Sequence, residues 1–222
     1  MKIKAIDISR TASASSIVFE VLRKAIIEGE LTEGEPLRQD EIARLFNTSR
    51  IPVREAISRL EEQGLVKTQR YKGAVVAGLS ASEAAEVFEL RALLEPEIIR
   101  NAVPRMSEEC LAEARSHCQA FSDSTSPMAW GSLNRVFHRT LYSASDLGYF
   151  IEVADNAMDR VERYIRAQLV MSDGMERAGR EHFAILEACE KGEAERAGLL
   201  LRDHILGAKV SLLDVFPKVS GR

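Results

Sequence analysis

Apolar residues recur every three or four positions in three short blocks within the first 64 residues. The blocks cover Ser15–Glu28, Gln39–Phe46 and a segment that starts near Thr48 and ends near Gln63. Gly29 and Gly64 follow the first and third blocks, where glycine readily takes the left-handed conformation that ends a helix. The pattern therefore predicts three helices. Side chains that can cap the first and third helices are Ser15 or Ser16 and Thr48 or Ser49.

The spacing of apolar residues changes after Gly64. Leu65–Gln69 and Ala74–Ala77 are short runs that contain β-branched residues, and the four residues RYKG separate them. Two such runs around a glycine-containing turn predict a β-hairpin. Three helices followed by a hairpin, in fewer than 70 residues, is the element order of a winged helix-turn-helix.

From Ser80 onward the helical spacing returns, and it recurs in six segments. Ser80 and Glu83 fit a capping box, and Pro96 predicts a bend in the helix that they start. The predicted segments are Ser80 to about Val103, Ser107–Ser122, Met128–Ser145, Gly148–Met171, Met175–Lys191 and Glu193–Val215. Short loops between them predict antiparallel neighbours. The expected fold is mainly α, with an N-terminal winged helix-turn-helix over residues 1–78 and an antiparallel six-helix bundle over residues 79–222.

The composition agrees with a folded globular protein. The 222 residues are 45% hydrophobic and 29% charged. No apolar run approaches the ~18 residues of a membrane-spanning helix, and the first residues show no continuous apolar stretch typical of a secretory signal. We therefore expect a cytoplasmic protein with no membrane role. The three cysteines have no Cys-x-x-Cys spacing, which argues against a disulfide framework or a zinc ribbon.

Charge is distributed unevenly between the two predicted domains. Residues 1–78 hold 13 Lys+Arg and 11 Asp+Glu, a net charge of +2, whereas residues 79–222 hold 17 and 23, a net charge of −6. The basic part is the small N-terminal domain. An acidic protein overall thus still presents a face that can attract an anionic partner.

The third predicted helix carries a polar stripe beside its apolar one. Arg50, Arg54 and Ser58 follow one another at intervals of four, with both arginines in the N-terminal half. That half faces base edges in a helix-turn-helix, where a guanidinium can bind guanine or phosphate. The hairpin tip adds Arg70 and Lys72. Periodicity alone leaves open a second interpretation, a solvated arginine face on an ordinary helical subdomain.

The string SRIPVREAISRLEEQGLV, with RQDEIARLFNT before it and RYKGAVV after it, resembles the DNA-binding domain of GntR-family bacterial transcription regulators. The resemblance covers residues 15–78. It departs from the family pattern at Glu33, where a proline is common before Gly34, and at Asn47, which replaces a frequent glycine. The resemblance implies DNA contacts for a small set of residues: Ser49, Arg50 and Arg54, with Arg38, Arg70 and Gly73 as further candidates.

Three of the four histidines lie on apolar stripes of separate predicted helices. His138, His182 and His204 should therefore all point into the bundle. Buried imidazoles need partners for their nitrogens, and a divalent metal supplies one for several rings at once. Asn134 precedes His138 by one helical turn and can reach the same ion. Each histidine taken alone is equally consistent with a satisfied core residue.

Residues 80–215 resemble the FadR C-terminal (FCD) domain. The segments that carry the resemblance are ELRALLEPEIIRNAV, NRVFHRTL, EHFAILEACEKGEAERA and RDHI. The resemblance implies a divalent transition metal, zinc or nickel, with ligands at Asn134, His138, His182 and His204. Asparagine stands where aspartate is commoner, so four neutral ligands leave the charge of the ion uncompensated and should draw an anion.

The same resemblance implies a small carboxylate metabolite beside the metal. Arg91 is the expected carboxylate clamp, because a guanidinium pairs with a carboxylate as a two-pronged fork. Further effector-binding candidates on one later helix are Arg160, Arg163, Tyr164 and Arg166. For any one of these, a solvated surface charge is the alternative.

These observations predict a ligand-responsive transcription regulator rather than an enzyme. We expect a homodimer that binds an inverted-repeat operator in double-stranded DNA and responds to a small organic acid. A metal-dependent enzyme is one alternative, but the chain has no His-Glu-x-x-His, Gly-x-Ser-x-Gly or phosphate-loop motif, and no catalytic residue is expected. The other alternative is a metal-stabilised helical interaction module.

Overall fold

The structure, a computed structural model, describes residues 13–171 and 174–219. It divides the chain into two compact units, Met1–Gly78 and Leu79–Arg222. The N-terminal stretch for which the sequence predicts no secretory signal lies, up to residue 12, outside the described residues.

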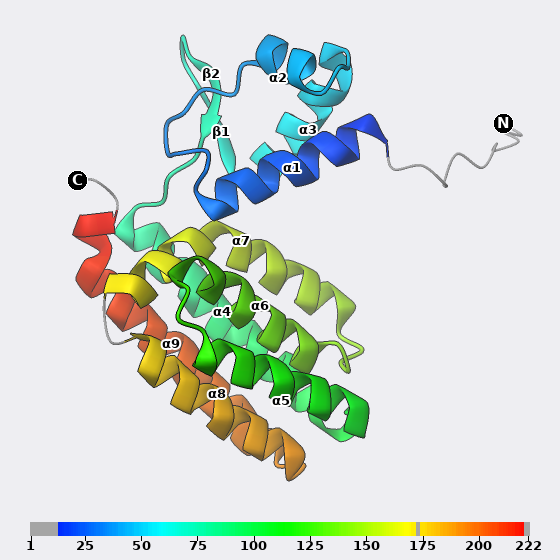
Figure 1. Ribbon diagram of the computed structural model, residues 1–222, viewed down its shortest axis with the longest axis vertical. Helices are drawn as coiled ribbons and strands as arrows, with labels where there is room; N and C mark the ends of the chain where they lie inside the picture. Colours follow the sequence, from blue (N-terminus) through cyan, green and yellow to red (C-terminus); the bar gives the residue numbers. More distant parts are fainter. Residues whose placement is uncertain (1–12, 172–173, 220–222) are drawn as a thin grey trace, which may run out of the picture. The chain divides into compact units, whose positions relative to one another are not determined.

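The first unit holds three helices and a two-stranded antiparallel sheet (Figure 1). Its elements are α1 (Ala14–Glu28), α2 (Gln39–Leu45), α3 (Arg50–Glu62), β1 (Val66–Gln69) and β2 (Gly73–Val76). Val66 pairs with Val76 at the open end of the hairpin, and Gln69 pairs with Gly73 at its tip. The predicted winged helix-turn-helix fold is therefore confirmed, within one or two residues at most element ends.

Two turns of the first unit depend on left-handed backbone. Asn47 has a φ of 47° in the turn between α2 and α3, and asparagine is one of the few non-glycine residues that tolerate this conformation. Asparagine can therefore replace the glycine that is frequent here without changing the turn. At the hairpin tip, Tyr71 has a φ of 66° and Gly73 a φ of 73°.

The cap of α1 differs from the expectation. The side chain of Ser13, and not that of Ser15 or Ser16, accepts the hydrogen bond at this helix end, from the backbone N–H of Ser16. The capping oxygen must lie two or three residues before the N–H that it binds. In a run of several serines, the residue at the actual helix start takes this role.

The core of the first unit lies between α1, α3 and the hairpin. Val18 and Ile26 of α1, and Val53 and Leu60 of α3, are almost fully buried there. The guanidinium of Arg59 lies 3.9 Å from the ring centre of Phe19, which adds a cation–π contact between α1 and α3.

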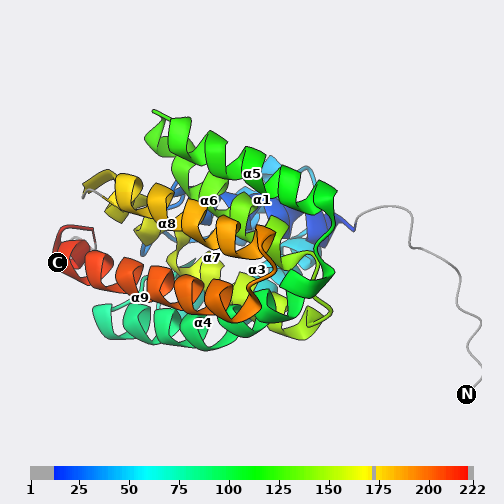
Figure 2. The same cartoon turned by 90° about the horizontal axis from the view of Figure 1, so that it is seen from below.

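The second unit is a bundle of six α-helices in its described part (Figures 1 and 2). Its elements are α4 (Ala81–Ala102), a 3-10 turn η1 (Val103–Arg105), α5 (Glu108–Asp123), α6 (Pro127–Tyr142), α7 (Gly148–Met171), α8 (Gly174–Glu190) and α9 (Ala194–Val219). The capping box of Ser80 and Glu83 is present. The helix α4 continues through Pro96 to Ala102, so the proline does not end it.

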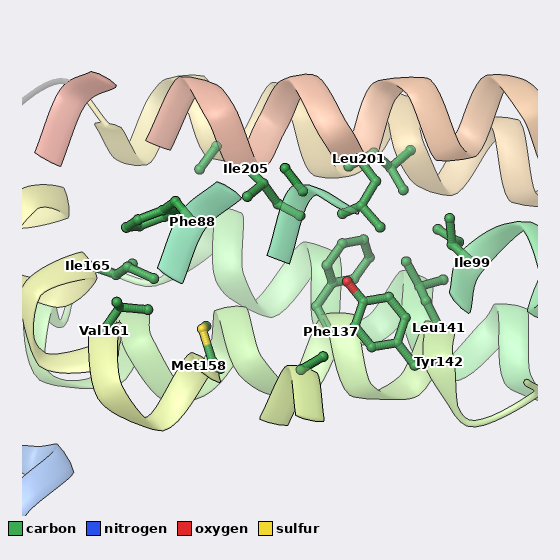
Figure 3. Close-up of a cluster of buried hydrophobic side chains, with 14 of the residues drawn as sticks. Phe88, Ile99, Phe137, Leu141, Tyr142, Met158, Val161, Ile165, Leu201 and Ile205 are labelled. Carbon is green, nitrogen blue, oxygen red and sulfur yellow. The ribbon is translucent and has the colours of Figure 1, made fainter. Parts of the chain in front are cut away.

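Helices α4 and α9 lie side by side and form the most extensive helix pair of the bundle (Figure 2). Apolar side chains from α4, α6, α7 and α9 fill the space between the helices (Figure 3). Phe88, Phe137 and Leu201 are among the large side chains with no appreciable exposure. Among the described residues, no helix combines the length and the apolar character needed to cross a membrane.

Candidate functional site

Three imidazole rings from three helices meet inside the bundle. His138 lies on α6, His182 on α8 and His204 on α9, and all three are buried. One ring nitrogen from each lies within 4.8 Å of the other two. The ring centres are 4.9–5.3 Å apart. The structure thus brings together the three histidines that the sequence placed on separate apolar stripes.

Several of these ring nitrogens have no partner. Nε2 of His138 and both ring nitrogens of His182 are buried and lack a hydrogen-bond partner among the described residues. Burial lowers the pKa of both rings well below the usual value, and the neighbouring histidines lower it further. The rings are therefore neutral, and their lone pairs are available to bind a cation.

The remaining nitrogens of two rings are held by neighbouring polar groups. Nδ1 of His204 lies 2.7 Å from Oε2 of Glu181, on α8. Nδ1 of His138 lies 3.4 Å from the hydroxyl of Tyr142. That hydroxyl in turn donates a 2.6 Å hydrogen bond to Glu95 of α4. Polar groups that fix the far nitrogen of a histidine in this way are typical of metal-binding histidines.

His182 is held by packing instead. The ring centres of Phe121 and Phe137 lie 4.7 and 4.5 Å from that of His182. The two phenylalanines come from α5 and α6 and are fully buried. They fix the plane of the ring without occupying either of its nitrogens.

The donor set fits a divalent transition metal. Neutral imidazoles are good ligands for zinc and nickel, and uncoordinated nitrogens in a dry core would carry a desolvation cost. Asn134 is buried one turn before His138 and lines a cavity together with His204. The described residues of this site therefore fit the ion that the sequence predicts, with three histidines as the nitrogen donors and Asn134 as the candidate oxygen donor.

Two small cavities lie against the histidines. One is bordered by His138, Tyr142 and Arg135; the other is bordered by His204, Asn134 and Arg177. Arg91 lines both. Each has a volume of about 20 Å³, room for about one water molecule. A metabolite larger than a few atoms therefore has to displace side chains in order to bind here.

The predicted effector residues occupy different surroundings. Arg91 is buried and forms a fork with Glu95, with distances of 2.5 and 3.3 Å from its nitrogens to the two carboxylate oxygens. Arg160 and Tyr164 are not among the residues that line either cavity. The hydroxyl of Tyr164 instead accepts a 2.9 Å hydrogen bond from the backbone N–H of Leu79. The structure thus brings only Arg91 of these three next to the histidines.

Sequence reasoning missed four residues of this site: Glu95, Tyr142, Glu181 and Arg177. Glu95 and Tyr142 had a local signal, because each lies four residues after Arg91 or His138 on the same helix. Glu181 and Arg177 approach His204 from a different helix. No spacing along one segment of chain indicates such a contact.

The candidate nucleic-acid interface lies in the first unit. Its six predicted residues are all exposed: Arg38, Ser49, Arg50, Arg54, Arg70 and Gly73. The backbone of Ser49 starts α3, and its side chain makes no capping hydrogen bond. Gly73 lies at the hairpin tip beside Arg70, whose guanidinium stacks 4.8 Å from the ring centre of Tyr71.

Three arginines of this interface, one at the N-terminus of α2 and two in α3, differ in their partners. Arg38 forms a 2.9 Å ion pair with Glu41, and Arg50 pairs with Asp40 of α2. Arg54 has no hydrogen-bond or ion-pair partner within the described residues. Its guanidinium is therefore available to an external acceptor without first leaving an internal one.

Two family models match separate parts of the chain. The family model described as bacterial regulatory proteins, gntR family, matches residues 14–76, and the FCD domain model matches residues 86–207.

Curated relatives match most of the chain. An uncharacterized HTH-type transcriptional regulator, BphR, from Paraburkholderia xenovorans is 29% identical, covering 90% of this chain and 85% of the relative. The HTH-type transcriptional repressor GlaR from Escherichia coli is 25% identical, covering 83% and 89%. A crystal structure of a GntR-family transcriptional regulator from Pseudomonas syringae is 32% identical, with a TM-score of 0.56, covering 94% of this chain and 88% of that one.

Proposed function

The chain belongs to the GntR family of bacterial regulatory proteins and carries an FCD domain, and from that premise we propose that it is a metal-containing repressor controlled by a small carboxylate. Members of this family are transcription regulators and not enzymes, and named relatives such as GlaR are repressors. In this proposal the first unit binds operator DNA, and the second binds the metal and the effector.

The observation that carries the proposal is the cluster of His138, His182 and His204. Nitrogens of these three buried rings lie within 4.8 Å of one another. Three of the ring nitrogens, on His138 and His182, have no hydrogen-bond partner among the described residues, which supports a cation site here. Asn134 adds a neutral oxygen donor at most. Four neutral ligands would give the ion, zinc or nickel, no negatively charged ligand in a low-dielectric core, which favours an anionic effector beside it.

In this proposal the effector signal passes along α4, the first helix after the boundary between the two units in the chain. This helix starts at Ala81, three residues after the boundary between the two units, and carries Arg91, which lines both cavities. An effector that binds one arrangement of α4 better than another changes the population of that arrangement, and operator affinity changes with it. A homodimer would place two α3 helices on the two halves of an inverted repeat.

Metal content tests the proposed metal site. Protein purified without added metal, and analysed by mass spectrometry of its metal ions, should carry about one zinc or nickel per chain. The His182→Ala variant should lose it. His117→Ala is the matched control, since His117 lies on α5 beside Glu113, outside the cluster. Equal metal content in all three proteins would refute the assigned ligands.

Operator binding tests the proposed control by a small carboxylate. DNA selected from a random library by the wild-type protein defines the operator, and its affinity is then measured at fixed salt with and without a series of small organic acids. At least one acid should weaken binding to the selected DNA in the metal-loaded protein. If saturating concentrations of every acid leave the affinity unchanged, the chain is a regulator without the proposed effector response.

A further inference from the structure

Two arginines that differ in their hydrogen-bond partners line the cavity next to His204. Arg91 and Arg177 both line it, together with Asn134. The remaining wall is formed by apolar side chains of α7, α8 and α9. A cavity of this kind, with cationic groups set in an apolar wall, is suited to an anion.

Arg91 already has its carboxylate. Its Nε and one terminal nitrogen bind the two oxygens of Glu95, and only about 4% and 3% of the two side chains is exposed. Glu95 also accepts the hydrogen bond of Tyr142. A second carboxylate at Arg91 would have to displace Glu95 and leave it buried without its counter-ion, which is costly.

Arg177 has an unused donor. Its Nε is buried and has no hydrogen-bond partner among the described residues. The carboxylate that approaches it is Glu181, whose Oε1 lies 3.7 Å from that Nε, beyond hydrogen-bond distance. The other oxygen of Glu181 is held by His204. A buried guanidinium N–H that points to no acceptor needs an external one.

We propose that Arg177, and not Arg91, binds the carboxylate of the effector, in the cavity beside Asn134 and His204. This inference rests on the proposed function, because the metal supplies part of the positive charge that attracts the anion. The cavity volume of about 20 Å³ favours a small ligand. Among carboxylates, a short-chain monocarboxylate requires the least displacement of the apolar wall, and acetate is the simplest carboxylate of this kind with a carbon chain.

The test measures acetate binding to the full-length, zinc-loaded protein by isothermal titration calorimetry, with chloride keeping the ionic strength constant. Arg177→Gln removes the charge and should weaken acetate binding by about tenfold or more. Arg177→Lys keeps the charge without the planar fork, so its acetate affinity should lie between that of the wild type and that of Arg177→Gln. Arg180→Gln is the matched control, because Arg180 lies on the same helix but is exposed and paired with Glu176; it should bind acetate as the wild type does.

Zinc content is measured in every sample, so that two failures are distinguishable. Wild-type protein that holds no zinc would contradict the proposed function. Wild-type protein that holds zinc but binds no acetate at tens of millimolar would overturn the inference alone. So would equal acetate affinity in wild type and both Arg177 variants.

Discussion

Nδ1 of His204 lies 2.7 Å from Oε2 of Glu181, so that a carboxylate of α8 orients a ring of α9. When Nδ1 of a neutral imidazole donates its hydrogen to a carboxylate oxygen, Nε2 keeps its lone pair. The contact therefore favours the tautomer in which Nε2 could bind a metal. It also places a negative charge next to a ligand set whose oxygen donor, Asn134, is neutral.

Removing that carboxylate should weaken metal binding without unfolding the bundle. We expect Glu181→Ala to lower zinc affinity by about 10–100-fold, since groups that orient metal-binding histidines contribute on this scale. Competition with a chromophoric chelator measures the affinity. Glu187→Ala provides the control, because Glu187 is exposed on the same helix and pairs with Lys191. Equal zinc affinity in the two variants would show that Glu181 does not orient His204.

The convergence of the histidines was predictable, whereas their surroundings were not. Each of the three shared a helical stripe with apolar residues, and a stripe that faces the core takes its histidine with it. The contact between Glu181 and His204 depends on how α8 and α9 are placed against each other. That placement results from packing of the whole bundle, which no local spacing records.

The surroundings of Arg91 were likewise not predicted from the sequence. The residue type and segment favour Arg91 as the carboxylate clamp, although Glu95 lies one turn later on the same helix. In the structure the two residues neutralise each other. Helix boundaries were more predictable: α7 spans Gly148–Met171 as expected, because loops interrupt the apolar spacing at both ends.

Two buried thiols should be unreactive at neutral pH. Burial raises the pKa of Cys118 and Cys189 to about 12. A raised pKa favours the thiol, so that at pH 8 roughly one molecule in ten thousand holds either residue as the reactive thiolate. In the folded protein, iodoacetamide followed by mass spectrometry should modify the half-buried Cys110 and leave the other two intact. All three should react in guanidinium chloride; equal rates in the folded state would contradict the burial of the two thiols.

Arg54 should contribute base preference as well as affinity. Its guanidinium is exposed on α3, and Arg54→Ala should cost about 1–3 kcal/mol on the selected operator and flatten the preference at one position. Arg54→Lys retains the charge, so it should keep most of the affinity for unselected DNA and its salt dependence while losing the same preference. Fluorescence anisotropy at several salt concentrations separates the two effects. An undiminished preference in both variants would remove Arg54 from the residues that read the bases.

The pair of Arg91 and Glu95 should be structural rather than effector-binding. Glu95→Ala leaves a buried guanidinium without its counter-ion and should destabilise the metal-free protein by about 3–5 kcal/mol in a guanidinium chloride titration. Replacing both residues with methionine removes both buried charges at similar volume and should recover most of that loss. The double variant then shows whether Arg91 or Arg177 binds the carboxylate of the effector. If Arg177 binds the carboxylate, zinc-loaded protein with both methionines should still bind acetate; loss of acetate binding in a stable, zinc-loaded double variant would return that role to Arg91.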